Sequence, residues 1–187
     1  MKLFDCLSNA SPRLKARVAG AFYLLTFLTG AVAAFSKGQL AAYEDAANLI
    51  ATACYVVVTV LFYDLFRPVS KQISLIAALF GLAGCALGAV GSLHLAIAPV
   101  NPLVLFGFYC LLIGYLIFNS GFLPRVLGVL MAFGGLSWLT FFSTDLVDYL
   151  APYNMAPGIL AEGLLTLWLL SFGVNIPKWQ KKAGLAS

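Results

Sequence analysis

Six runs of apolar residues, separated by short polar or proline-containing stretches, make up most of the chain. Most of these runs reach about 20 residues, which is the length that an α-helix needs to cross the hydrocarbon core of a bilayer. The pattern predicts six spans, over residues 14–35, 46–66, 72–98, 103–118, 124–143 and 157–176. We therefore expect an all-α, polytopic six-transmembrane-helix bundle that forms a single integral membrane domain over residues 1–187. Residues 145–155 are expected to form its longest polar loop.

Small residues form a stripe along the third predicted span. Ala77, Gly81, Gly84, Gly88 and Gly91 recur at intervals of four and three, so they fall on one face of a helix. Helices in lipid associate through close backbone contact, which glycine permits. The stripe predicts that this helix is the central one, against which the others pack. The alternative is that the glycines leave room for a ligand.

Composition and charge support a membrane location and indicate an orientation. The chain is 62% hydrophobic and 10% charged, whereas a soluble domain carries about a quarter charged residues. With the N-terminus placed in the cytoplasm, ten of the 11 lysines and arginines fall on the cytoplasmic side and only Lys37 on the other. The positive-inside rule then predicts cytoplasmic N- and C-termini, in a bacterial inner membrane. The net charge of +4 reports this orientation, and no nucleic-acid partner is expected.

Polar residues in the outer half of the predicted bundle form a candidate ligand-binding site. Ionisable residues inside spans are costly and often functional. Glu162 lies about one turn inside the last span, on the same helical face as Thr166, and this face is expected to point into the bundle. His94, the only histidine, lies near the end of the third span at a similar depth. Asn48 and Asp145, at neighbouring outer ends, are expected beside them. The alternatives are a hydrogen-bonded pair that only fixes helix register and a glutamate that lies near an aqueous cleft at the membrane interface.

A second acidic residue is expected to have a structural role. Asp64 lies at the inner end of the second span. Arg17, Arg67 and Arg125 are predicted at the same face of the membrane. Because isolated charges are unfavourable in a low-dielectric medium, we expect Asp64 to form an ion pair there.

The chain contains none of the common catalytic motifs. There is no H-E-x-x-H, no G-x-S-x-G and no glycine-rich phosphate loop. The four cysteines form no C-x-x-C pair, and three of them lie in apolar runs, where small polarizable side chains pack well. A metal site would need more ligands than Glu162 and His94 provide. We therefore expect no metal and no cofactor.

Several segments resemble a known family. They read RVAGAFYL from Arg17, LFRPV from Leu65 and GYLIFNSGFLPRVLGVL from Gly114, followed by AEG from Ala161 and LWLL from Leu167. These segments are similar to those of a bacterial family of multi-span membrane proteins, catalogued as domain of unknown function four-three-eight-six. The resemblance extends over nearly the whole chain. It implies a six-helix membrane fold with a glutamate in the last helix, and it implies no established activity.

Three functions are consistent with these features. The first is a protein that binds or moves a lipid-like or other hydrophobic small molecule through a pocket in the outer half of the bundle, which needs apolar walls and a few polar groups. The second is an intramembrane enzyme that uses Glu162 and His94 as an acid/base pair on a lipid substrate. The third is a membrane scaffold or accessory subunit. The first is favoured, so an enzyme is not expected. The expected partners are membrane lipids and a hydrophobic small molecule, and a homo-oligomer is compatible with the sequence.

Overall fold

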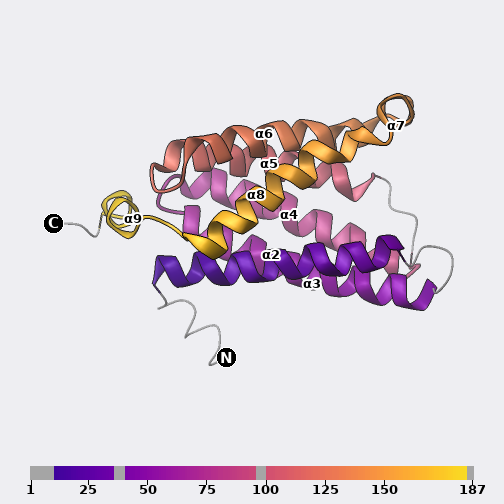
Figure 1. Cartoon of the computed structure of the whole chain (residues 1–187), viewed down its shortest axis with the longest axis horizontal. Helices are drawn as coiled ribbons and strands as arrows, with labels where there is room; N and C mark the ends of the chain where they lie inside the picture. The colour runs from indigo at the N-terminus through magenta and orange to yellow at the C-terminus, as the bar shows by residue number, and fades with distance from the viewer. Residues whose placement is uncertain (1–10, 36–40, 96–99, 185–187) are drawn as a thin grey trace.

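The computed structural model describes residues 11–35, 41–95 and 100–184, which form helices and no strand (Figure 1). Lys37 and Pro99, where the third span was expected to close, lie outside the described residues. The long helices are α2 (Pro12–Phe35), α3 (Ala41–Phe66), α4 (Lys71–Ser92), α5 (Pro102–Ser120), α6 (Arg125–Leu139) and α8 (Ala156–Ser171). The short helices are η1 (Thr140–Phe142), α7 (Thr144–Leu150), η2 (Tyr153–Met155) and α9 (Ile176–Lys182).

The six long helices pack as a closed ring. Each of them packs against the helix before it and the helix after it, and α8 closes the ring by packing against both α6 and α2. Figure 1 shows α8 running obliquely across the gap between α6 and α2. The inside of the ring is filled by side chains, among which Tyr23, Tyr109, Phe62 and Leu165 are fully buried.

The ring has no central helix, so the prediction that α4 holds this position is wrong. The main neighbours of α4 are α3 and α5. A Cβ added at Gly84 would lie 2.9 Å from the Phe106 ring, but one added at Gly88 would meet only Thr52 Oγ1 at 3.8 Å, and one at Gly91 would meet nothing within 4 Å. The stripe is therefore a packing surface over only part of its length.

The closest approach of two backbones is between α5 and α6. A Cβ at Gly114 would lie 2.7 Å from the carbonyl oxygen of Gly128, and one at Gly107 would lie 3.0 Å from that of Gly135. Glycine at all four positions lets the two helices touch along their length. This is the type of contact that holds helices together in lipid.

The outer surface of the ring is apolar, as a membrane-embedded bundle requires. Five helices are long and apolar enough to cross a membrane. The segment Tyr153–Ser171 meets the same test together with α9, from which it is bent by 105°. Large side chains such as Leu79, Val126 and Phe133 are about 60% exposed. The chain is therefore a multi-pass membrane protein, and the predicted all-α membrane bundle is confirmed.

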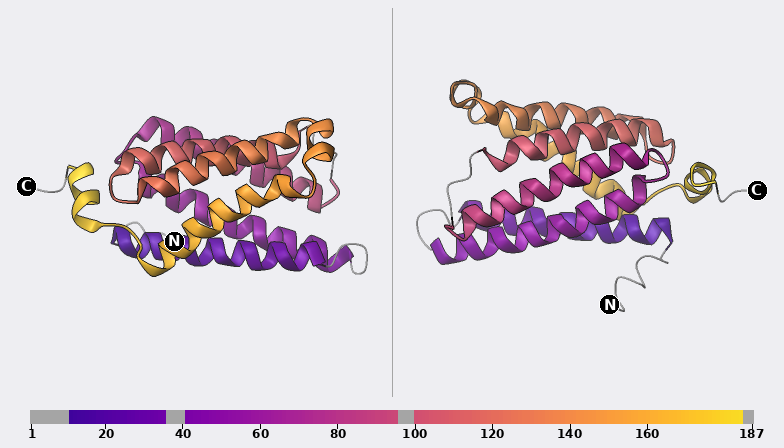
Figure 2. Two further views of the ribbon diagram at one scale, coloured as in Figure 1. Left: turned by 45° about the horizontal axis from the view of Figure 1, so that its top comes forward. Right: turned by 180° about the vertical axis from the view of Figure 1, so that it is seen from behind.

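Several predicted boundaries differ from the observed ones. The third helix ends at Ser92 and does not continue to residue 98, because His94 adopts a left-handed backbone conformation with φ of 52°. The expected polar loop 145–155 contains α7 and η2. The last span ends at Ser171, short of residue 176. The chain then turns at Gly173, whose φ of 66° favours glycine, and α9 begins in a new direction. Figure 2 shows α9 set crosswise beyond one end of the bundle.

Candidate functional site

Glu162 lies inside the ring and is only 7% exposed. Its two carboxylate oxygens accept hydrogen bonds from different helices. The Tyr23 hydroxyl on α2 donates to Oε2 at 2.6 Å, and the Trp138 indole Nε1 on α6 donates to Oε1 at 2.6 Å. The Cys110 thiol on α5 lies 3.5 Å from Oε1. The expected direction of Glu162, into the bundle, is the one observed. We call Tyr23, Tyr55, Cys110, Trp138 and Glu162 the polar centre.

The polar centre depends on a glycine one turn before the glutamate. Gly158 and Glu162 lie on the same face of α8, four residues apart. A Cβ at Gly158 would lie 2.4 Å from the Trp138 ring. The missing side chain therefore leaves the space in which the indole lies across α8. This position brings the indole N–H to the carboxylate.

Two tyrosine hydroxyls extend the polar centre toward α3. The Tyr23 and Tyr55 hydroxyl oxygens are 3.3 Å apart, and both side chains are buried. Because the one hydroxyl proton of Tyr23 goes to Glu162, Tyr55 donates to Tyr23. Their rings meet edge to face with centroids 5.4 Å apart, and the Tyr55 ring lies 4.7 Å from that of Phe106. The two hydroxyls thereby connect Glu162 on α8 to α3, which is not one of the main neighbours of α8 in the ring.

Tyr55 also lines a pocket between α2, α3, α4 and α5. The pocket has a volume of about 230 Å³. We call it the Asn48 pocket, and its lining residues are Thr26, Asn48, Ala51, Thr52, Tyr55, Gly88, Ser92 and Phe106. Aromatic and small apolar groups form its walls together with an amide and three small hydroxyl side chains. Tyr55 is common to the pocket and the polar centre.

The structure does not bring His94 to Glu162. The His94 side chain is 77% exposed, and its Nε2 lies 3.0 Å from Asp45 Oδ2. It follows the end of α4 with a left-handed backbone, so it leaves the helical face on which the sequence placed it. The acid/base pair expected for an intramembrane enzyme is therefore not assembled.

The other predicted site residues are also separated. Asn48 lies in the Asn48 pocket and is not among the hydrogen-bond partners of Glu162. Thr166 is buried, but its hydroxyl donates to the Glu162 carbonyl oxygen of its own helix at 2.8 Å. Asp145 is exposed on α7, beyond the end of the bundle. Of the five predicted ligand-binding residues, Asn48 alone lines this pocket.

The sequence analysis did not predict the three hydrogen-bond donors to Glu162, which are Tyr23, Cys110 and Trp138. A partial signal exists for Tyr23, because Ala16 and Ala19 share its helical face and all three are fully buried. A polar aromatic residue on a face of small residues indicates a position inside a bundle. For Trp138 the signal is weaker, because tryptophan in a span is more typical of the membrane interface.

Asp64 forms the ion pair that the sequence predicted, but with a different partner. Lys15 Nζ contacts Asp64 Oδ2. The side chain of Lys15 is almost fully buried, whereas that of Asp64 is 39% exposed. The arginines Arg17, Arg67 and Arg125, which were expected as partners, are exposed in the structure.

The described residues include no cluster of three or more histidine, cysteine, aspartate or glutamate side chains that could hold a metal ion. Cys54, Cys85 and Cys110 are free and buried. Cys110 contributes to the polar centre as a weak donor.

Comparison with known proteins finds one family model that matches part of the chain. Residues 98–173 match Domain of unknown function (DUF4386). The match confirms the predicted resemblance over this part of the chain. The DUF4386 segment includes Cys110, Trp138 and Glu162, whereas Tyr23 and Tyr55 precede it.

A relative from Archaeoglobus fulgidus, named Uncharacterized protein, is 37% identical over 82 residues. The aligned part covers 41% of this chain and 51% of the relative, so the chain spans about half the length of the relative that it matches. No solved structure matches the chain.

Proposed function

We propose that this protein binds or moves a lipid-like or other hydrophobic small molecule in the Asn48 pocket. The single observation that carries the proposal is the double role of Tyr55. This residue lines the pocket and belongs to the hydrogen-bonded polar centre. A bound molecule can therefore contact a side chain that is connected to the buried carboxylate.

The composition of the pocket supports a molecule that is mostly apolar and carries a hydrogen-bonding group. Ligand pockets combine hydrophobic walls with a few polar groups that fix orientation. Phe106, Ala51 and Gly88 supply apolar surface, while Asn48 and Thr52 supply an amide and a hydroxyl. The volume of about 230 Å³ accommodates a headgroup or a short chain, not a whole phospholipid.

The polar centre supports a coupling between the ligand and Glu162. The Tyr55 hydroxyl donates to Tyr23, and its oxygen can still accept one more hydrogen bond. A ligand that donates to this oxygen would strengthen the chain of hydroxyls that ends at Glu162. A ligand that withdraws the Tyr55 proton would weaken it. Binding of a molecule in the pocket would therefore change the hydrogen bonding of Glu162.

The proposal includes an orientation and a location. We place the Asn48 pocket in the outer half of a bacterial cytoplasmic membrane, with both termini in the cytoplasm. The supporting observation is the charge distribution, because the nine basic residues in the described part of the chain gather at the end opposite to this pocket.

The alternative function as an intramembrane enzyme has less support. It depends on His94 and Glu162 acting together on one substrate. His94 is paired with Asp45 in an exposed position, and Glu162 is buried with other partners. We therefore propose binding or movement of a small molecule, without a chemical step.

A photocrosslinking experiment tests the proposal. A diazirine-bearing residue replaces Phe106 in the pocket or, as the matched control, Phe133, which is 61% exposed on the lipid-facing surface. After irradiation of native membranes, mass spectrometry identifies the adducts. We expect one enriched molecule at position 106 and bulk membrane lipids at position 133. The same adducts at both positions, or no adduct at position 106, would contradict the proposal.

A further inference from the structure

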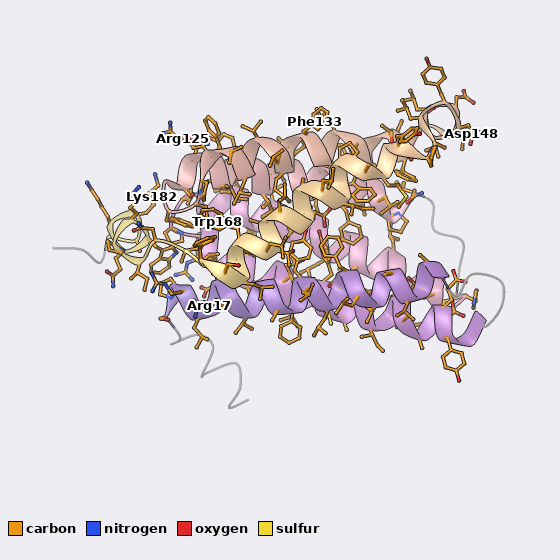
Figure 3. All side chains as sticks on the ribbon, viewed as in Figure 1. Arg17, Arg125, Phe133, Asp148, Trp168 and Lys182 are labelled. Carbon is orange, nitrogen blue, oxygen red and sulfur yellow. The ribbon has the colours of Figure 1, made fainter. Side chains whose placement is uncertain are left out.

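Positive charge is concentrated at the end of the bundle that carries α9. The basic residues in the described ranges are Arg13, Lys15, Arg17, Arg67, Lys71, Arg125, Lys178, Lys181 and Lys182. In Figure 3, Arg17, Arg125 and Lys182 lie at this end, and Asp148 lies at the opposite end. The one described acid at the basic end is Asp64, which pairs with Lys15. No salt bridge between described residues neutralises Arg13 or the lysines of α9.

Two of these cations line a cleft that also has aromatic walls. The cleft lies between α2, the α5–α6 turn and the α8–α9 turn, and its volume is about 380 Å³. Arg13 and Lys178 line it together with Asn175, Trp168 and Phe172. We call it the basic cleft. The rings of Trp168 and Phe172 are tilted by 34° relative to each other, with centroids 4.5 Å apart, so they present a continuous apolar surface beside the charges.

A second hollow continues the basic cleft along α9. It has a volume of about 390 Å³ and is lined by Ser120, Gly121 and three lysines, Lys178, Lys181 and Lys182. Gly121 and Lys178 are common to both hollows. The cations are therefore arranged along one continuous depression.

Specific contacts hold the walls of the depression in place. The Asn175 backbone N–H donates to the Phe122 carbonyl oxygen at 3.1 Å, which ties the α8–α9 turn to the α5–α6 turn. The Trp179 indole donates to the Leu65 carbonyl oxygen at 2.9 Å, which ties α9 to the end of α3. Since α9 is bent by 105° from α8, it lies across the axis of the bundle. A helix set across the end of a membrane bundle can run along the membrane surface, at the depth of the lipid headgroups.

We infer that the basic cleft and the adjoining lysines bind the headgroup of an anionic phospholipid. Arginine and lysine form strong charge-assisted hydrogen bonds with phosphate oxygens, and basic hollows between spans are suited to anionic headgroups. Trp168 and Phe172 would contact the glycerol and the first part of the acyl chains, where aromatic residues are favoured. This lipid site lies at the other end of the bundle from the Asn48 pocket and is independent of the proposed function.

Competition between two lipids tests the inference. The purified full chain is placed in nanodiscs with equal amounts of phosphatidylglycerol and phosphatidylcholine, and native mass spectrometry measures the lipid retained per chain. The wild type should retain phosphatidylglycerol in preference. In the double variant Arg13→Gln/Lys178→Gln the preference should fall about tenfold or more, because the two side chains lose their charge-assisted hydrogen bonds to the lipid phosphate and glutamine can form only weaker, neutral ones. The matched control, Arg67→Gln/Lys71→Gln, removes the same charge outside the cleft and should change the preference by less than about threefold.

Three outcomes would overturn the inference. They are an absence of preference in the wild type, equal losses in the two double variants, and full displacement of the lipid by excess inorganic phosphate, which would identify free phosphate as the ligand. Gel filtration and circular dichroism establish that each variant folds. If the cleft variant does not fold, Lys181→Gln/Lys182→Gln replaces it, because these side chains are exposed. This pair should reduce the preference more than the control does.

Discussion

At the scale of single residues, the molecule holds a buried carboxylate in an apolar bundle, and no cation among the described residues forms an ion pair with it. An isolated charge is unfavourable in such a medium, so the group needs hydrogen-bond donors. The donors to Glu162 are a hydroxyl, an indole N–H and a thiol, each from a different helix. The polar centre therefore joins α2, α5 and α6 to α8. Buried hydrogen bonds of this kind specify how helices are rotated relative to one another.

Replacement of Glu162 tests the role of these donors. Glu162→Leu leaves the Trp138 N–H and the Tyr23 hydroxyl without their acceptor, and a buried donor without a partner costs about 1–3 kcal/mol. We expect the free energy of unfolding to fall by about 2 kcal/mol or more. Glu162→Gln should lose less, because its carbonyl oxygen can accept from Trp138 while its amide donates to Tyr23. Thermal unfolding in detergent measures both. A Leu variant as stable as the wild type would contradict the role assigned to the carboxylate.

The sequence predicted the direction of Glu162 but not its partners. The face of the last helix contains small residues beside the glutamate, which indicates burial against other helices. The partners depend on how each helix is rotated about its axis, and a span that is apolar on all sides carries little information on rotation. His94 was misplaced for a local reason. The helix was expected to continue to residue 98, whereas it ends at Ser92 and His94 adopts a left-handed conformation.

At the scale of elements, glycines determine which helices come close together. The contact of α5 with α6 is made through facing glycine backbones. The contact of α8 with α6 depends on Gly158, over which the Trp138 ring lies. The stripe on α4 has the strongest glycine periodicity in the sequence, yet its last two glycines make no close contact. The periodicity of the glycines predicted which of them share a face of a helix. It did not predict which neighbouring helix packs against that face, or whether any helix does.

Two glycines on α8 provide a matched comparison. Gly158→Ala would place a methyl group 2.4 Å from the Trp138 ring, so the indole must move away from Glu162. We expect a loss of stability of about 1–3 kcal/mol, as is typical of overpacking. The new Cβ in Gly163→Ala would meet no atom within 4 Å. This substitution should therefore be neutral, or should stabilise the protein by up to about 1 kcal/mol, because alanine has a higher helix propensity than glycine. Tryptophan fluorescence and thermal unfolding would report both changes. Equal stabilities of the two variants would show that Gly158 does not position Trp138.

At the scale of the whole molecule, the two ends of the bundle differ in charge. One end carries α9 and the basic cleft, and the other carries α7 with Asp145 and Asp148. Figure 3 shows Lys182 and Asp148 at these opposite ends. The apolar runs predicted an all-helical membrane bundle, because a chain that crosses lipid must satisfy its own backbone hydrogen bonds. The distribution of lysine and arginine predicted its orientation, because these residues are enriched on the cytoplasmic side of a membrane. The ring arrangement and the bend before α9 depend on contacts between distant segments, so the sequence alone did not predict them.

Cysteine labelling tests the orientation. In a chain without its native cysteines, Lys182→Cys and Asp148→Cys each place one exposed thiol at an end of the bundle. With cytoplasmic termini, a membrane-impermeant maleimide added to intact cells should label position 148 and not position 182. Permeabilised cells serve as the control, in which both positions should react. The reverse pattern in intact cells would invert the proposed topology and place the basic cleft outside.

The Asn48 pocket is proposed to hold a small molecule, and its occupancy can be measured directly. The direct measurement is native mass spectrometry of the protein released from its own membranes, compared with a variant whose pocket is filled. Gly88→Leu places a side chain in the pocket, where the nearest atom to a new Cβ is Thr52 Oγ1 at 3.8 Å. Gly91→Leu is the control, because Gly91 lies one turn further along α4, is exposed and has nothing within 4 Å. We predict that the wild type and Gly91→Leu retain the same bound molecule and that Gly88→Leu folds but loses it. Equal retention by all three proteins, or no bound molecule in any of them, would contradict the claim.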